Sequence, residues 1–135
     1  MPLFGKESTE QLNTAHPDLQ RLFCLVVKTM DCKVLCGHRD EYEQNKAYDL
    51  GLSKLKYPKS KHNTTPAKAV DVVPYFSMSP HIRWDDIKTF YYFAGYVKAT
   101  AQQLGIKVRW GGDWDGDNDL NDQDFMDMTH WELVG

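Results

Sequence analysis

The sequence predicts an α+β fold: one domain in which helices pack on a small, mainly antiparallel sheet. Three observations favour this class: a chain of 135 residues, a long amphipathic segment over residues 84–105, and short β-prone runs separated by turn residues. A chain of this length can bury a core without disulfides or a metal, so we expect a single domain over residues 1–135.

The first third of the chain is predicted to be helical. Ser8 followed by Gln11 matches a capping box, and Pro17 stands at a first helical turn, ahead of apolar residues at helical spacing. Residues 33–36 are short and β-prone, and a second helical region follows them and ends at Gly51.

The second half alternates loops, strands and one long helix. Residues 52–66 lack periodicity and contain two prolines, which predicts a long exposed loop. Strands are expected at 69–76, 106–110 and 129–134, and a helix at 84–105. That helix is predicted to turn one apolar face to the core, formed by Ile87, Phe90, Tyr91, Ala94, Val97, Ala101 and Leu104.

Composition excludes several partners. The net charge of -3 gives no general attraction to nucleic acid or to an anionic membrane, and no segment approaches the ~20 apolar residues that span a bilayer. The three cysteines include no C-x-x-C pair, so we expect reduced, mostly packed thiols. No signal peptide is recognised in the first residues, and we expect synthesis in the cytoplasm.

Asp71 lies between two valines in a predicted strand, where an unpaired buried carboxylate would cost several kcal/mol. The carboxylate therefore either faces solvent or is held by a cation. His62 and His130 would complete a set of two imidazoles and one carboxylate, the ligand type of a catalytic zinc site. Taken singly, each histidine is equally explained as a surface or core residue.

Two further residues have both a functional and an ordinary explanation. Asp127, three residues before His130, either accepts the proton of a zinc-activated water or is one more acid in an acidic loop. Arg39 either stabilises a developing oxyanion or pairs at the surface with Asp40 or Glu41.

Four blocks of sequence carry a resemblance to a known family. They are, in order, GHRDEYEQNKAYDLGLSK, SKHNTTPAKAVDVVPY, WGGDWDGD and DMTHWEL. Between about Gly37 and Leu133 the chain resembles the zinc D-alanyl-D-alanine peptidases, and within that group the L-alanyl-D-glutamate endopeptidases that bacteriophages use as endolysins. The resemblance implies the D-Ala-D-Ala metallopeptidase-like fold, with the zinc site at the sheet.

The resemblance also implies a set of zinc ligands. The family motif S-x-H-x-x-G-x-A-x-D supplies two ligands, which map onto His62 and Asp71, and a later D/E-x-x-H block supplies the third, His130. The interval between the first two is longer than the common family spacing, and Thr65-Pro66 stands where a glycine turn is expected. A loop insertion must therefore bring both ends back into register, or Asp71 is lost from the site.

The remaining site residues are carried over in the same way. Asp127 maps onto the catalytic base and Arg39 onto the arginine that stabilises the transition state. Ser60 occupies the leading serine position and Gln44 lies on the helix after the arginine, and we expect both to bind substrate. Zinc would activate the water, and Asp127 would pass the proton to the leaving amine.

An acidic loop in the last third has two interpretations. Its acids alternate like the oxygen ligands of an EF-hand, with Asn118 where a glycine normally takes the sharp turn. The loop either binds Ca²⁺, which would order the approach to Asp127, or is simply solvated. The candidate ligands are Asp113, Asp115, Asp117, Asp119, Asn121 and Asp124.

Together these features predict a peptidoglycan-degrading zinc endopeptidase that cuts the L-alanyl-D-glutamate bond of the stem peptide. The lysines at 54–61 either meet stem carboxylates or form an ordinary basic loop. Alternatives are a D-alanyl-D-alanine carboxypeptidase or dipeptidase, and a non-catalytic wall-binding or virion module. We expect a monomer that reaches the wall from the host cytoplasm after another protein has opened the membrane.

Overall fold

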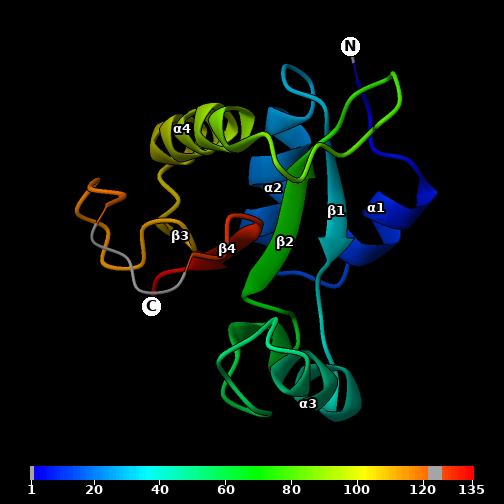
Figure 1. Cartoon of the computed structure of the whole chain (residues 1–135), viewed down its shortest axis with the longest axis vertical. Coiled ribbons are helices and arrows are strands. Elements are labelled where there is room, and N and C mark those ends of the chain that lie inside the picture. Colours follow the sequence, from blue (N-terminus) through cyan, green and yellow to red (C-terminus); the bar gives the residue numbers. More distant parts are fainter. Residues whose placement is uncertain (1, 122–125) are drawn as a thin grey trace.

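A four-stranded antiparallel sheet carries the fold (Figure 1), in a computed structural model that describes residues 2–121 and 126–135. The strand order is β1-β2-β4-β3, and each neighbouring pair is antiparallel. This confirms the predicted α+β class. The strands are β1 (Cys32–Cys36), β2 (Ala69–Pro74), β3 (Val108–Trp110) and β4 (His130–Leu133).

Helices surround this sheet unevenly. α2 packs against α4, α4 contacts β2 and β3, and α1 contacts β1. α3 stands apart, beyond the end of β1 and close to the start of β2 (Figure 1). The helices are α1 (Lys6–Leu12), α2 (Pro17–Val26), α3 (Glu41–Asp49) and α4 (Ile87–Leu104). Pro17 begins α2 as predicted, and Gly105 ends α4 in the left-handed conformation.

The predicted capping box at the first helix is wrong. α1 begins one residue after Gly5, so Ser8 lies inside the helix, where it is buried. Its hydroxyl accepts a hydrogen bond from the Val34 N–H, and the Gln11 side-chain oxygen accepts one from the Gly37 N–H. These two side chains therefore hydrogen-bond to β1 and to the segment after it. They do not cap the start of their own helix.

Alternation along the strands separates the core from the opposite face of the sheet. Val70 and Val72 of β2 and Trp131 of β4 belong to the apolar core, where Trp131 stacks on Trp110 at 5.9 Å between ring centroids. Because successive side chains in a strand point to opposite faces, Asp71 is directed away from that core. All six residues of β2 are buried, so Asp71 does not face open solvent.

The buried face of α4 differs from the predicted one. Ile87 is 47% exposed and Tyr91 is 38% exposed, whereas Phe93 and Thr100 are buried. The helix packs against both α2 and the sheet, and these contacts bury the face that includes Phe93. Tyr91 lies at the edge of that face, against Trp110. The buried residues are Phe90, Phe93, Ala94, Val97, Thr100 and Ala101.

The helices, the cysteines and the long loop can each be set beside their predictions. Within the described ranges, no helix combines the length and apolarity needed to cross a bilayer. All three cysteines are free thiols; Cys32 is buried and Cys36 half-buried, but Cys24 is exposed. The region predicted to be an irregular loop, 52–66, contains one 3-10 turn, η1 (Lys61–Asn63).

The orientation of α4 gives a testable prediction. Phe93→Ala should lower the free energy of unfolding by about 3–5 kcal/mol, because it empties a fully packed core position. Tyr92→Ala, a matched aromatic truncation at a position that is 73% exposed, should change it by less than about 0.5 kcal/mol. Urea unfolding of both variants measures the difference, and equal losses would contradict the observed helix face.

Candidate metal centre and active site

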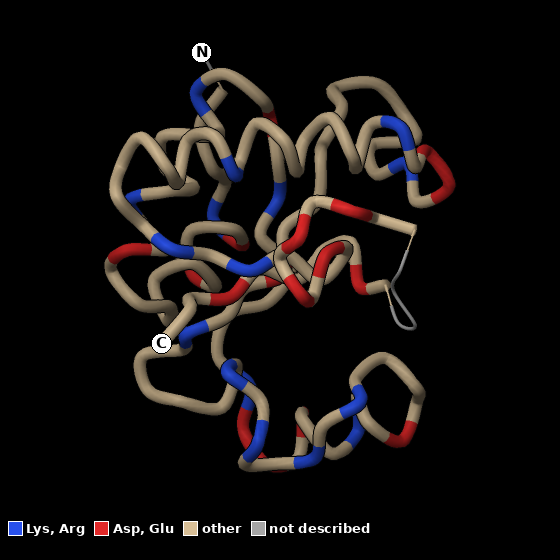
Figure 2. Tube along the Cα trace, turned by 90° about the vertical axis from the view of Figure 1, so that its left-hand side faces the viewer, with Lys and Arg blue, Asp and Glu red and all other residues tan. Residues whose placement is uncertain are grey.

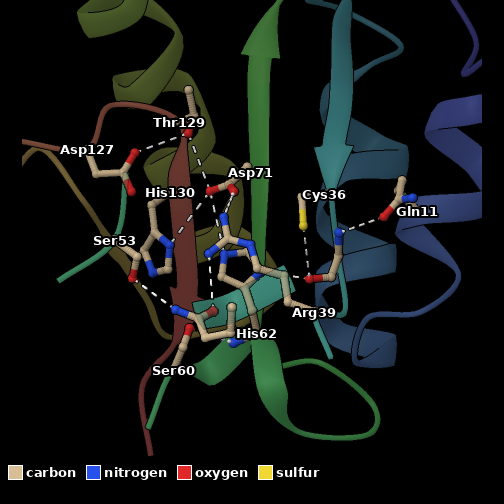
Figure 3. A network of polar contacts seen from close by, with 12 residues as sticks. Gln11, Cys36, Arg39, Ser53, Ser60, His62, Asp71, Asp127, Thr129 and His130 are labelled. Carbon is tan, nitrogen blue, oxygen red and sulfur yellow. Dashed lines mark hydrogen bonds and ion pairs between the residues drawn. The ribbon is translucent and has the colours of Figure 1, made fainter. Parts of the chain in front are cut away.

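Antiparallel pairing brings three predicted ligands together (Figure 3). Asp71 of β2 stands directly opposite His130 of β4, and His62 comes from η1, just before β2. The Asp71 Oδ1 atom lies 3.6 Å from His62 Nε2 and 3.7 Å from His130 Nδ1. All three side chains are buried, so the sheet gathers two imidazoles and a carboxylate around one point.

The long interval between His62 and Asp71 is absorbed by the loop between them. Ala67 forms a bridge with the connection between α1 and α2, and the Lys68 N–H donates to the Thr64 hydroxyl. Both ends of the loop thereby return to register. The departure from the common family spacing does not remove Asp71 from the cluster.

The ring nitrogens of the two histidines have distinct partners. His62 Nδ1 lies 2.7 Å from the Gly37 carbonyl oxygen, which can only accept, so this nitrogen carries the proton. His62 Nε2 is then left with a lone pair, buried and without a hydrogen-bond partner among the described residues. His130 Nε2 contacts Glu132 Oε1 at 2.8 Å, which leaves its Nδ1 facing Asp71. An unsatisfied buried nitrogen beside a carboxylate fits a bound cation.

Charge compensation in this cluster is strong. Burial by itself would raise the pKa of Asp71, but His62, His130 and Arg39 hold it well below the usual range, so the carboxylate stays ionised. Burial would lower the pKa of His130, yet its hydrogen bonds to Asp71 and Glu132 raise the pKa to about 9. Without a metal, His130 is therefore protonated at neutral pH and faces Asp71 as a cation, in addition to Arg39.

Arg39 is fixed against the same carboxylate. Its Nη2 lies 2.7 Å from Asp71 Oδ2, and its backbone N–H donates to the His62 carbonyl. The surface pairing with Asp40 is not formed, because the Asp40 carboxylate caps α3 by accepting the Glu43 N–H. Arg39 thus stands at the junction of β1 and α3, and its partner Asp71 is 32 residues away in the sequence.

Gln44 and Ser60, which were expected to bind substrate, are both enclosed by the protein. Gln44 is completely buried, accepts a hydrogen bond from Arg39 Nη1 at 3.3 Å and donates to loop residues 53–55. Ser60 is also buried, and its hydroxyl caps η1 by accepting the His62 N–H. Both side chains are used inside the protein, where they position Arg39 and His62.

Asp127 lies at the edge of the cluster and is held by a close backbone approach. Its N–H donates to the Gly111 carbonyl, and a Cβ at Gly111 would lie only 2.1 Å from the Asp127 carbonyl oxygen. The Thr129 hydroxyl lies 3.2 Å from Asp127 Oδ1 and 3.3 Å from Asp71 Oδ1. Burial, followed by the charge of Asp71, raises the pKa of Asp127. Such a carboxylate can take and return a proton.

The cluster opens into a cleft of about 290 Å³. Arg39, His62, Asp127 and His130 line it, so the polar groups all face one space. The loop after α3 supplies the apolar Leu52 and Leu55 and the cationic Lys54, and Trp114 lies across from them, 5.1 Å from the His130 ring. Figure 2 shows basic positions gathered around α3 and this loop, and acidic ones in the loop after β3.

Comparisons with known proteins match nearly the whole chain. A family model described as phage L-alanyl-D-glutamate peptidase matches residues 2–134. The chain belongs to this phage L-alanyl-D-glutamate peptidase family. It is 34% identical, over 97% of both chains, to the L-alanyl-D-glutamate peptidase of Escherichia phage T5. Its fold matches the crystal structure of the Serratia marcescens L-Ala D-Glu endopeptidase ChiX with a TM-score of 0.75 and 28% identity, over 97% of this chain and 89% of that one.

The family resemblance of the four sequence blocks is therefore confirmed, but two residues of this peptidase centre were missed. Glu132 contacts His130, and the spacing His-x-Glu in a strand could have placed both on one face. Cys36 pairs with Asp71 across β1 and β2 and was interpreted only as a packed thiol. Ligand atoms of Cys36, His62 and Asp71 lie within 4.8 Å of one another, as do those of Asp71, Asp127 and His130.

The acidic loop of this family member is partly arranged as predicted. Carboxylate oxygens of Asp113, Asp115 and Asp117 lie within 4.8 Å of one another, and Asn118 adopts a φ of 65° at the position of the expected glycine. Asp119 is not in that group, and Asp124 lies outside the described residues. The Lys98 ammonium, 2.8 Å from the Asn118 side-chain oxygen and 3.8 Å from Asp113, already places a positive charge there.

The raised pKa of His130 predicts how the stability of the metal-free peptidase depends on pH. Protonation of His130 is stronger in the folded state, so its contribution is complete below the ordinary pKa of 6.5 and is lost as pH rises through about 9. The free energy of unfolding, measured in urea with a chelator present, should fall across that window. His130→Gln should flatten this part of the profile, and an unchanged slope would contradict the assignment.

Proposed function

We propose that this chain is a zinc-dependent endopeptidase that hydrolyses the bond between L-alanine and D-glutamate in peptidoglycan stem peptides. The observation that carries the proposal is the convergence of His62, Asp71 and His130 at one point, beside a cleft that His62, His130 and Asp127 line. The names of the phage T5 relative and of the Serratia enzyme support the choice of bond.

His62 Nε2, Asp71 Oδ1 and His130 Nδ1 would hold the metal. Two imidazoles and one carboxylate are a ligand set typical of catalytic zinc, which keeps one position open. When bound, zinc supplies Lewis acidity, which polarises a carbonyl group and makes water more acidic. The positive charge would also compensate the buried Asp71 carboxylate, which answers why an acid stands in the middle of β2.

Asp127 would act as the general base and then as the general acid. Its half-buried carboxylate lines the cleft, where it can take a proton from attacking water and return it to the leaving amine. Its raised pKa brings the carboxyl closer to the working pH, which favours both transfers. Thr129, hydrogen-bonded to Asp127 and to Asp71, would keep the base beside the metal ligands.

Arg39 would stabilise the oxyanion that develops on the scissile carbonyl. A guanidinium has five N–H donors, and the contacts with Asp71 and Gln44 occupy only two of them. Arg39 also lines the cleft, so other donors can face a substrate while these two contacts fix its position. Donors held in place before charge develops contribute most to catalysis.

The walls of the cleft suit a short peptide. Leu52, Leu55 and Trp114 offer apolar surface that excludes water from the reacting bond. D-Glutamate keeps one free carboxylate when its other carboxyl is in peptide linkage, and Lys54 offers a cation for it at the cleft wall. One chain supplies every residue named here, which supports a monomer that acts at the peptidoglycan layer.

Purified peptidoglycan provides the direct test. Mass spectrometry of digests should show fragments that end in L-alanine and fragments that begin with D-glutamate. Chelation of zinc should abolish them, and added Zn²⁺ should restore them. Release of terminal D-alanine instead would indicate a carboxypeptidase, binding without any cleavage would indicate a wall-binding module, and cleavage unaffected by chelation would contradict the zinc mechanism.

Asp127→Asn, measured in the same experiment, distinguishes a residue that acts as the base from one that binds the metal. Loss of general acid–base catalysis should lower kcat by about 10²–10⁴-fold, with zinc affinity little changed. Asp85→Asn, which removes an exposed carboxylate of the loop before α4, is the matched control and should leave both quantities unchanged.

The acidic loop gives a separate prediction, that Ca²⁺ binds to zinc-loaded protein through Asp113, Asp115 and Asp117. Isothermal titration calorimetry should detect this binding, and Asp115→Asn with Asp117→Asn should remove it. No binding heat in the wild-type protein would leave the solvated-loop interpretation.

A further inference from the structure

A second buried carboxylate, that of Glu132, lies beside His130 and lines the same cleft. Glu132 is two residues along β4, on the same face of the sheet, because Trp131 between them points into the core. It is 8% exposed, and its Oε1 lies 2.8 Å from His130 Nε2, the ring nitrogen that faces away from Asp71. A charged group so deeply buried needs compensation from its neighbours.

Two cations from different elements supply that compensation. Lys61 Nζ lies 3.2 Å from Glu132 Oε2, and Arg109 Nη1 lies 3.5 Å from the same oxygen. Arg109 stands directly opposite Glu132 in the pairing of β3 with β4. Lys61 belongs to η1 and also donates to the Leu133 carbonyl. One carboxylate thus joins η1, β3 and β4.

The division of partners between the two oxygens has a chemical consequence. Since Lys61 and Arg109 engage Oε2, the other oxygen remains for His130 and can only accept a hydrogen bond. His130 Nε2 must then carry a proton, so the lone pair of the neutral ring lies on Nδ1. That nitrogen is the one directed at Asp71.

The same network also links two ligand-bearing segments. Lys61 directly precedes His62, and its ammonium contacts Glu132 and the end of β4. The backbone adds a further connection, because the Lys68 N–H donates to the Lys61 carbonyl and the Leu133 N–H donates to the Lys68 carbonyl. The Lys61 side chain and this backbone connection therefore together fix the position of η1 relative to β4.

We propose that Glu132 is a positioning residue of the metal centre: held by Lys61 and Arg109, it fixes the tautomer and ring orientation of His130 and ties η1 to β4. The proposal rests on the metal-binding role proposed above for His62, Asp71 and His130. Carboxylates that accept the second ring N–H of a metal-binding histidine typically contribute 10–100-fold to metal affinity.

Glu132→Gln tests this with little change in size. Lys61 and Arg109 are donors and will select the amide oxygen, which turns the amide NH₂ toward His130 Nε2. The ring is then driven to the opposite tautomer, with its proton on Nδ1. Competition with a chromophoric chelator should show zinc affinity weakened about 10–100-fold. Long-range ¹H–¹⁵N spectra of the metal-free protein, at a pH where the His130 ring is neutral, should show the ring proton on Nε2 in the wild type and on Nδ1 in the variant.

Three further variants make the result decisive. Glu132→Asp keeps an acceptor of the same charge and should retain the wild-type tautomer. Lys61→Gln with Arg109→Gln leaves Glu132 in place but removes its two cationic partners, and should weaken zinc binding relative to the wild type, though less than Glu132→Gln does. If Glu132→Gln does not fold, unchanged zinc affinity in this double variant would overturn the proposal. Glu7→Gln, which removes an exposed carboxylate paired with Lys33, is the control and should change nothing.

The outcomes separate positioning from a purely structural salt bridge. A Glu132→Gln protein with a lower Tm, but with zinc affinity within about two-fold and the same His130 tautomer, would overturn the proposal. If wild-type protein binds zinc and shows the predicted variant effects but cuts no peptidoglycan, the positioning role stands and the proposed function fails.

Discussion

The buried charge of Asp71 is the constraint around which the site is arranged. A carboxylate in the centre of a fully buried strand requires compensation that its own strand lacks, and burial without it would cost several kcal/mol. His130 from β4, His62 from η1 and Arg39 from the junction before α3 all approach this group. The contacts that keep one acid ionised also assemble a cluster of candidate metal ligands.

The sheet makes this arrangement compatible with a stable core. Strand alternation assigns Val70, Val72 and Trp131 to the apolar side and leaves Asp71 and His130 on the other. A substitution on the core side is therefore expected to change stability, whereas one on the opposite face is expected to change the charge of the candidate metal site. Short strands are enough to form this site, because two candidate ligands, Asp71 and His130, stand opposite each other and the third, His62, comes from η1 just before β2.

Buried polar side chains hold the catalytic and ligand candidates in place. Gln44 supports Arg39, Ser60 caps the turn that presents His62, and Glu132 accepts from His130. Each is buried, and each uses its hydrogen-bonding capacity inside the protein. Such support makes it possible for the groups that line the cleft to keep fixed orientations before a substrate arrives. Arg39, His62 and His130 are thus each held by a hydrogen bond with a neighbouring buried side chain.

The sequence by itself determined the α+β class, the approximate elements and, through spaced motifs, the family and the candidates His62, Asp71 and His130. These depend on local periodicity and on residue order, which are readable along the chain. Only the tertiary structure decided which face of α4 is buried, that Gln44 is enclosed, that Arg39 pairs with Asp71, and which nitrogen of each histidine is available. Those features depend on residues that are distant in sequence. Which side chain is buried, and which atom it hydrogen-bonds to, follows only once the chain has folded and the position of the partner is fixed.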